Sequence, residues 1–253
     1  MPYPAHVSDA AYCYDGSYAG FLCCIFESYT RREIPSAVLG PAEGQITLFG
    51  TETIATDPTH ARRVANGLTR LGPRVWERVM TGFLSTEEEK DLILLRFARR
   101  CFDEGPRAVQ MLGDPDVHAA FVLERNVNNE VCRFIELIRF EEKDGMLGSV
   151  IHPKNNVLPL LRGHFCSRLP DEDFLIFDAA HGTALLRQSG HVQYLAMEHY
   201  EPARDADELN WQALWKRFFH ALTIEERRNA KAQMNHAPKR FWGGMVEMRE
   251  PYI

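Results

Sequence analysis

Three glycine-containing turns divide the second half of the chain into short segments, and this pattern restricts the fold more than any other feature. The turns are Lys143-Asp144-Gly145, His181-Gly182 and Ser189-Gly190, and glycine at such places permits the backbone of a hairpin turn. Strand-like runs lie at 133–142, 146–152, 174–180, 183–188 and 191–198, with a helical segment at 157–169. Because the turns join neighbouring runs and no parallel crossover pattern stands out, the segments predict an antiparallel sheet in the order β-β-α-β-β-β.

Helix signals dominate the first half of the chain. Asp57-Pro58 and Asp114-Pro115 each combine a helix N-cap with proline at the first helical position. Ser85 and Glu88 form a capping box, which predicts that a further helix begins at Ser85. The first half is therefore expected to be mainly helical.

These signals together predict an α+β fold. A strand-like run at 11–15 precedes a strongly apolar helix at 18–29, and one more short strand is expected near 52–55. We predict a mainly helical lobe over residues 1–130. Residues 131–253 are expected to form the antiparallel sheet, covered by C-terminal helices and packed with the first lobe as one compact unit.

Residues 211–242 combine an aromatic helix with a basic segment. Apolar side chains recur at helical spacing and define one face: Trp211, Leu214, Trp215, Phe218 and Leu222. We expect this face to cover one side of the sheet, with Trp211 in the core. Thr223 and Glu226 form a capping box that predicts a second helix from Thr223, and Pro238 ends that helix.

Two segments are basic within an acidic chain. Between residues 57 and 78 there are five arginines and two acids, and between residues 215 and 240 there are seven cations and two acids, whereas the whole chain carries a net charge of −6. Arginine forks suit phosphate groups, and aromatic residues among cations can stack on bases. The alternative is a solvated surface, with the first group of arginines paired to the acidic run at 87–89.

If both basic segments bind nucleic acid, one groove lined by both is the simplest arrangement. The candidate nucleic-acid-binding residues are Arg62, Arg63, Arg74, Arg227, Arg228, Asn229, Lys231, Lys239, Arg240 and Trp242. The net negative charge argues against a nonspecific nucleic-acid coat, but it is compatible with a local basic groove on an acidic body.

Motifs with specific chemistry are missing from the sequence. There is no P-loop, no GxGxxG, no GxSxG, no HExxH, no zinc-deaminase signature and no three-cysteine cluster motif, so we expect no cofactor and no metal. Asp178 follows the apolar run FLIF, and with His164 or His181 it is a candidate for acid–base catalysis. The alternative is that Asp178 caps a β-turn and the histidines lie on the surface.

The cysteines and the hydropathy pattern bear on where the protein resides. Six cysteines occur without a CxxC pair, and the sequence shows no signal peptide and no apolar run of membrane-spanning length. Cysteines used in this way are typical of reduced cytosolic thiols. We therefore expect a cytoplasmic protein with no membrane contact.

Six stretches, spread over nearly the whole chain, carry a resemblance to a known family. They lie at 14–29, 56–68, 133–140, 164–169, 174–178 and 214–242, and the last, with LWKRFF, TIEERRNAKAQ and PKRFW, is the most specific. The chain resembles bacterial proteins described as DNA metabolism or repair proteins. These are often encoded beside or fused to a uracil-DNA-glycosylase-like protein, and beside a radical-SAM protein with DNA-repair features. The resemblance implies DNA and these proteins as partners, but it carries over no catalytic residue, and similar proteins have His-Arg where this chain has Asn128-Asn129.

Three functions follow as hypotheses. The first is a DNA-repair-associated protein that binds single-stranded or damaged DNA and works with a radical-SAM or glycosylase partner. The second is a DNA-processing enzyme, a nuclease or a glycosylase-like protein, that uses Asp178 and a nearby histidine. The third is a protein-interaction adaptor that does not contact DNA.

Overall fold

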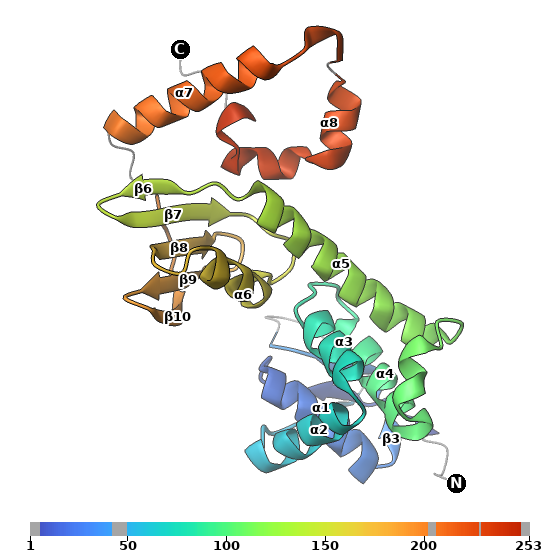
Figure 1. Ribbon diagram of the computed structural model, residues 1–253. Coiled ribbons are helices and arrows are strands. Elements are labelled where there is room, and N and C mark those ends of the chain that lie inside the picture. The colour runs from blue at the N-terminus through green and yellow to red at the C-terminus, as the bar shows by residue number, and fades with distance from the viewer. Residues whose placement is uncertain (1–5, 42–49, 202–205, 228, 249–253) are drawn as a thin grey trace. The chain divides into compact units, whose positions relative to one another are not determined.

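The chain forms two compact units, Met1–Asn128 and Asn129–Ile253, in the computed structural model. The structure describes residues 6–41, 50–201, 206–227 and 229–248 (Figure 1). Each unit combines helices with a small sheet, so the α+β class predicted from the sequence is confirmed.

The first unit contains short parallel strands, of which the sequence predicts only some. β4 (Ala37–Leu39), β2 (Ala11–Cys13) and β5 (Thr51–Thr53) form a three-stranded sheet in this order, and β1 (His6–Val7) pairs with β3 (Glu33–Ile34). β2 and β5 match the strands predicted near 11–15 and 52–55. The other strands have two or three residues each, which is too short for an alternating pattern to be recognised.

Helices make up most of the first unit. They are α1 (Tyr18–Thr30), α2 (Pro58–Arg70), α3 (Pro73–Phe83), α4 (Lys90–Glu104), the 3-10 helix η1 (Pro106–Gln110) and α5 (Pro115–Leu137), which continues into the second unit. Asp57 and Asp114 cap α2 and α5 as predicted, since each carboxylate accepts backbone N–H groups of the first turn. The predicted helix start at Ser85 is wrong. Its hydroxyl accepts from the N–H of Glu87 within a turn, and α4 begins at Lys90.

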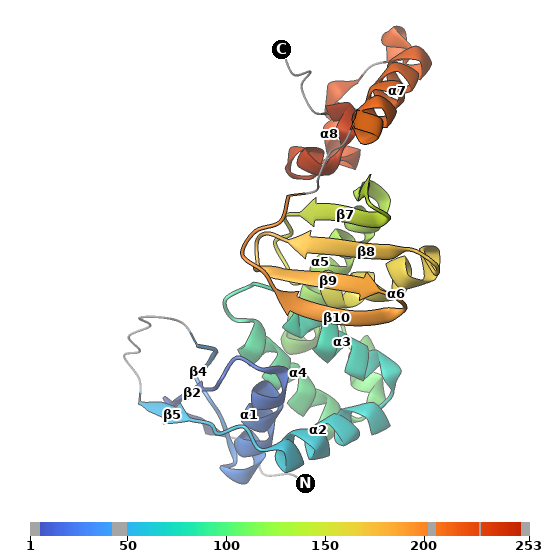
Figure 2. The same cartoon turned by 90° about the vertical axis from the view of Figure 1, so that its left-hand side faces the viewer.

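The second unit is built on a five-stranded sheet with the order β10-β9-β8-β7-β6, and Figure 2 shows β10, β9, β8 and β7 in this order. Its elements are β6 (Glu141–Lys143), β7 (Met146–Ile151), α6 (Leu158–Arg168), β8 (Asp173–Asp178), β9 (Thr183–Gln188) and β10 (His191–Ala196). The predicted order β-β-α-β-β-β is therefore confirmed. The turns also behave as expected, because Asp144, Gly145, Ser189 and Gly190 all have positive φ angles.

Two details predicted for this region are wrong. β7 and β8 run parallel, with Met146 opposite Asp173, because α6 carries the chain back along the sheet before β8 begins. Residues 133–137 end α5 and do not form a strand. Phe134 is buried there against Phe241, with 4.9 Å between ring centroids, and a buried helix end has the same continuous apolar pattern as a buried strand.

Side chains of β8 alternate between the two faces of the sheet, and each face has its own cover. Phe174 packs against Phe140, which also contacts Phe165 of α6. On the opposite face Phe177 contacts Tyr200, which follows β10. Both faces of β8 are thus occupied by segments that precede the C-terminal helices.

The C-terminal helices do not cover the sheet face as predicted. α7 (Ala206–Leu222) contacts the edge strand β6 and the 3-10 helix η4 (Val246–Met248), and Trp211 is 68% exposed. The predicted helix start at Thr223 is also wrong, because its hydroxyl donates to the carbonyl of Phe219 at 2.8 Å. The chain continues through η2 (Glu225–Arg227), α8 (Ala230–His236) and η3 (Lys239–Gly244). Within the described ranges, no helix has the length and apolar character needed to cross a membrane.

Candidate nucleic-acid interface

Helix α2 exposes three arginines that have no acidic partner among the residues that the structure describes. Its buried face consists of Ala61, Val64 and Leu68. Arg62, Arg63 and Arg70 lie outside this face and are exposed, as helical periodicity requires. In the part of the chain that the structure describes, none of the three forms an ion pair. Three guanidinium groups are therefore available to bind an anion.

A pocket of about 600 Å³ lies beside these arginines, between α1, α2 and α4. Its lining consists of Ile25, Phe26, Tyr29, Thr30, Arg63, Val64, Gly67, Arg70 and Phe102. Gly67 permits the close approach of α2 to α4, because a Cβ atom there would lie 2.8 Å from the Phe102 ring. The pocket thus combines aromatic walls with two of the unpaired arginines.

The rings of this pocket are arranged in pairs. Phe26 stacks on His60 with 3.9 Å between centroids, and the guanidinium carbon of Arg63 lies 5.8 Å from the Phe26 centroid. Tyr29 meets Phe102 edge to face at 6.0 Å. Burial raises the pKa of Tyr29 to about 12, so its phenol stays protonated at neutral pH. Aromatic faces beside arginines are the groups with which proteins hold unstacked bases and their phosphates.

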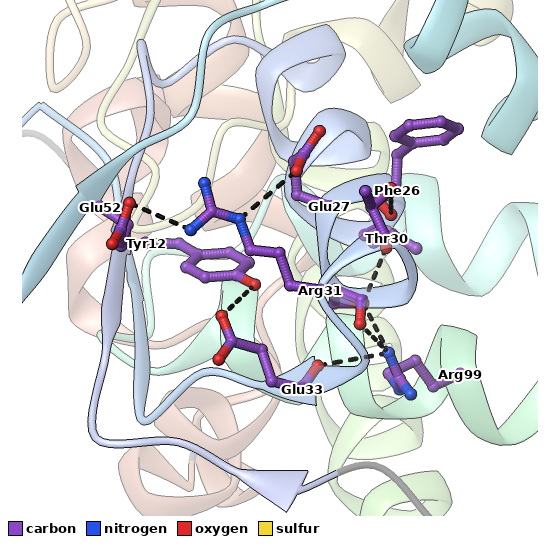
Figure 3. Close-up of polar contacts among 10 residues, drawn as sticks. Tyr12, Phe26, Glu27, Thr30, Arg31, Glu33, Glu52 and Arg99 are labelled. Atoms are coloured by element: carbon purple, nitrogen blue, oxygen red, sulfur yellow. Dashed lines mark hydrogen bonds and ion pairs between the residues drawn. The ribbon is translucent and has the colours of Figure 1, made fainter. Parts of the chain in front are cut away.

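Other cations near the pocket are engaged in contacts that hold the unit together (Figure 3). Arg31 pairs with Glu27 at 3.4 Å and with Glu52 at 3.0 Å, which joins the end of α1 to β5. Arg99 of α4 donates to the backbone carbonyl of Ser28 at 2.9 Å. These arginines are already paired, in contrast to those on α2.

Arg74, a predicted nucleic-acid contact, lies in an acidic environment. Its guanidinium pairs with Glu77 at 3.2 Å and lies 3.7 Å from Glu124. Arg78, on the next turn of α3, is buried and pairs with Glu124 at 2.7 Å. The arginines of α3 are therefore paired with Glu77 and Glu124, and their charge is locally compensated.

Three of the predicted C-terminal contacts line a second pocket, of about 640 Å³: Arg227, Asn229 and Trp242. Two of them also have structural partners. The side chain of Asn229 caps α8, and Trp242 donates from Nε1 to the carbonyl of Ala237 at 2.7 Å. Arg228, a further predicted contact, lies outside the described residues.

The remaining basic candidates differ in how strongly they are held. Lys231 and Lys239 are exposed, and the Lys239 ammonium lies 5.9 Å from the Trp242 ring. Arg240 pairs with the buried carboxylate of Glu130 at 3.1 Å. The arginines of α2 and these residues belong to different compact units, so the predicted common groove stays a prediction.

Asp178 is predicted to act with a histidine, and the structure pairs it with His181. The Asp178 carboxylate is buried, accepts from the backbone N–H groups of Ala180 and His181, and lies 2.7 Å from His181 Nδ1. Burial raises the pKa of Asp178, although the hydrogen bond from His181 opposes this shift. His164 is not part of this pair. Its Nε2 is buried and has no hydrogen-bond partner among the described residues.

The backbone contacts of Asp178 are those of a residue that caps a β-turn. Its hydrogen bond to His181 is also compatible with acid–base catalysis. Asn128 and Asn129 are both exposed on α5. No group of three or more His, Cys, Asp or Glu side chains suited to a metal ion occurs within the residues that the structure describes.

Sequence reasoning missed the aromatic half of the first pocket. Phe26 and Tyr29 lie in a helix so apolar that burial on most sides is predicted, yet Tyr29 is 38% exposed and Phe26 is only partly buried. Phe102 belongs to the apolar stripe of α4. Their position beside the arginines of α2 depends on how the three helices pack, which no local pattern indicates.

Comparison with known proteins gives a family. No curated protein and no solved structure matches the chain. A family model described as a domain of unknown function, DUF4130, matches residues 88–247. α1 and α2 precede this range, so most of the first pocket lies outside it. Because the match covers more than half of the 253 residues, the chain belongs to the DUF4130 family.

Proposed function

We propose that this protein binds single-stranded DNA, including unpaired segments at damaged sites, through the pocket between α1, α2 and α4. The observation that supports this most is the combination of three unpaired arginines on α2 with partly exposed aromatic rings next to them. Arg62, Arg63 and Arg70 would hold successive phosphates. Phe26 and Tyr29 would offer surfaces on which an unstacked base can lie.

Electrostatics favour this site over the neighbouring arginines that already have partners. The cations of Arg31, Arg74, Arg78 and Arg99 are paired with carboxylates or backbone carbonyls, so a bound strand would have to displace those partners. The α2 arginines need no such exchange. Because the whole chain is acidic, binding would be confined to this local surface.

DNA is proposed as the nucleic acid because six stretches of the sequence resemble DNA metabolism and repair proteins. On the same ground we propose a radical-SAM or a uracil-DNA-glycosylase-like partner, and because all six cysteines are free thiols we propose that the protein works in the cytoplasm. In this role it would hold an exposed strand while the partner carries out the chemistry.

The salt dependence of the binding constant should reflect the number of phosphate contacts. With a fluorescently labelled single-stranded oligonucleotide, three contacts predict a slope of about −2 in a plot of log binding constant against log salt concentration. A duplex of the same sequence should bind more weakly, because its stacked bases cannot reach the aromatic rings. Fluorescence anisotropy over a salt series measures both. A flat salt response, or no binding at low salt, would rule the proposal out.

A second candidate function is an acid–base reaction on damaged DNA, and the Asp178–His181 hydrogen bond is the observation that favours it. A buried carboxylate that is hydrogen-bonded to Nδ1 of a histidine fixes the orientation of the ring. The Nε2 atom can then exchange protons with a substrate. The His181 side chain is 25% exposed, so the ring is partly open to solvent.

The substitution Asp178→Asn separates this candidate from a structural role. The asparagine side chain retains an oxygen that can accept the two backbone hydrogen bonds, so the fold and the affinity for DNA should be unchanged. Base release or strand cleavage on uracil-containing or abasic oligonucleotides should be lost. Circular dichroism, anisotropy and gel analysis of the products give the three measurements. If the wild-type chain leaves all these substrates intact, or if the variant fails to fold, this candidate is removed.

A further inference from the structure

Helix α7 exposes the apolar face that is predicted to cover the sheet. The exposed fractions are 68% for Trp211, 52% for Leu214, 42% for Trp215, 54% for Phe218 and 65% for Leu222. These five residues, which we call the α7 seam, follow helical spacing and form one continuous stripe. An exposed stripe of aromatic and leucine side chains on one helix indicates an interaction surface.

The face by which α7 contacts its own unit is the more polar one. Glu208, Gln212, Lys216 and Phe219 are the residues of α7 that are partly buried. Glu208 accepts from the backbone N–H of Glu142 in β6 and from Gln212, and Trp215 donates from its ring nitrogen to Glu247 of η4. The helix is thus held at the sheet edge by hydrogen bonds, one of them from the ring nitrogen of Trp215, and the side chains of its apolar stripe remain 42–68% exposed.

The spacing within the seam suits a particular occupant. Trp211, Trp215, Phe218 and Leu222 are separated by four, three and four residues, which is the alternation of a helix–helix seam. This series is the same in either direction along the helix. Two copies of α7 placed antiparallel about a twofold axis between positions 216 and 217 would therefore set Trp211 opposite Leu222 of the second copy, and Trp215 opposite Phe218 of the second copy.

We propose that a second copy of this chain covers the α7 seam, so that the protein is a symmetric dimer joined by antiparallel α7 helices. A twofold interface requires a surface that is complementary to itself, and the four-three-four spacing meets this requirement. Five side chains about half exposed correspond to roughly 500 Å² per copy, or about 1,000 Å² for the pair, which reaches the lower limit for a specific interface. Antiparallel helices also place opposite dipole ends side by side.

The test is the mass of the full chain in solution and its dependence on concentration. Sedimentation equilibrium should show a reversible dimer for the wild-type protein. Phe218→Glu should raise the dimer dissociation constant on the order of 100-fold, because a charge would lie at the centre of the seam in both copies. Leu209→Glu is the matched control. Leu209 is 52% exposed on the same helix but lies on the opposite side from Trp211, so this variant should remain a dimer.

The orientation of the helices can be measured separately. A nitroxide label at position 210, in a variant with Asn210→Cys and Cys132→Ser, should report a separation of about 20 Å along the helix axes between the two copies if they are antiparallel. Labels side by side would indicate parallel helices and would overturn the arrangement. A wild-type monomer at high concentration, or a Phe218→Glu variant that dimerises as well as the wild type, would overturn the dimer itself. Neither result depends on DNA binding.

Discussion

Replacing both Arg63 and Arg70 by alanine should weaken the binding of single-stranded DNA on the order of 30-fold, or about 1 kcal/mol for each lost phosphate contact. Both side chains line the aromatic pocket and lack an acidic partner among the described residues. Removing two of three contacts should also make the salt slope shallower, from about −2 to about −0.7. Anisotropy titrations of the variant over the same salt series give both quantities.

Two single variants make this result specific. Arg107→Ala removes a cation of the same unit that is 80% exposed and lies outside the pocket, so it should leave the affinity nearly unchanged. Phe26→Leu keeps an apolar side chain but removes a stacking surface, so it should weaken binding without changing the salt slope. A loss of binding free energy for Arg107→Ala that is half the loss in the double variant would show that only the overall charge matters.

Arg78→Ala should lower the free energy of unfolding by about 3–5 kcal/mol. Arg78 and Glu124 are 4% and 6% exposed and are joined at 2.7 Å, and Arg78 also donates to the carbonyl of Val109 at 3.0 Å. The variant would leave the Glu124 carboxylate buried, with the Arg74 guanidinium 3.7 Å away. Urea denaturation followed by circular dichroism measures the loss.

A double variant distinguishes a lost ion pair from lost packing. Arg78→Met with Glu124→Leu removes both charges and keeps apolar volume, so it should recover most of the stability lost in Arg78→Ala. Arg133→Ala is the surface control. Its pair with Glu136 is 36% and 58% exposed, and its loss should change the stability by less than about 0.5 kcal/mol. If the double variant is as unstable as Arg78→Ala, packing around the guanidinium is the larger contribution.

Features that depend on a few neighbouring residues are predictable from this sequence. The caps at Asp57 and Asp114 and the turns at Asp144-Gly145 and Ser189-Gly190 occur where they are predicted. In each case a side chain or a backbone angle acts within about four residues, so the local sequence contains the whole interaction. The capping boxes at Ser85 and Thr223 fail because each hydroxyl bonds a different backbone group nearby.

Features that depend on packing could not be predicted in the same way. The end of α5 is apolar, as a buried strand would be. It is buried as a helix, because Phe134 packs against Phe241, more than 100 residues later in the chain. The parallel pairing of β7 with β8 depends on the path of α6, which the sequence indicates only as a helix. The α7 seam satisfies the pattern of a core helix, yet its apolar side chains are exposed.

The candidate site also combines features that the sequence predicts with features that depend on packing. Composition alone identifies Arg62, Arg63 and Arg74 as one basic group, because charge can be counted without a fold. Arg74 differs from the unpaired arginines of α2 because it pairs with Glu77 on its own helix and, through a tertiary contact, lies 3.7 Å from Glu124. Packing of α1, α2 and α4 brings Phe26 and Phe102 to those arginines, whereas His181 meets Asp178 through a local contact over three residues.

The sequence by itself determined the α+β class, the order of elements in the second unit, the hairpin turns and the positions of the basic segments, since each follows from short-range backbone preferences or from charge. The tertiary structure decided which arginines remain unpaired, which rings form the pocket beside them, and that the aromatic face of α7 is exposed. Those outcomes depend on side chains that are distant in the chain and meet only after the helices pack, and burial and charge pairing are properties of that packing.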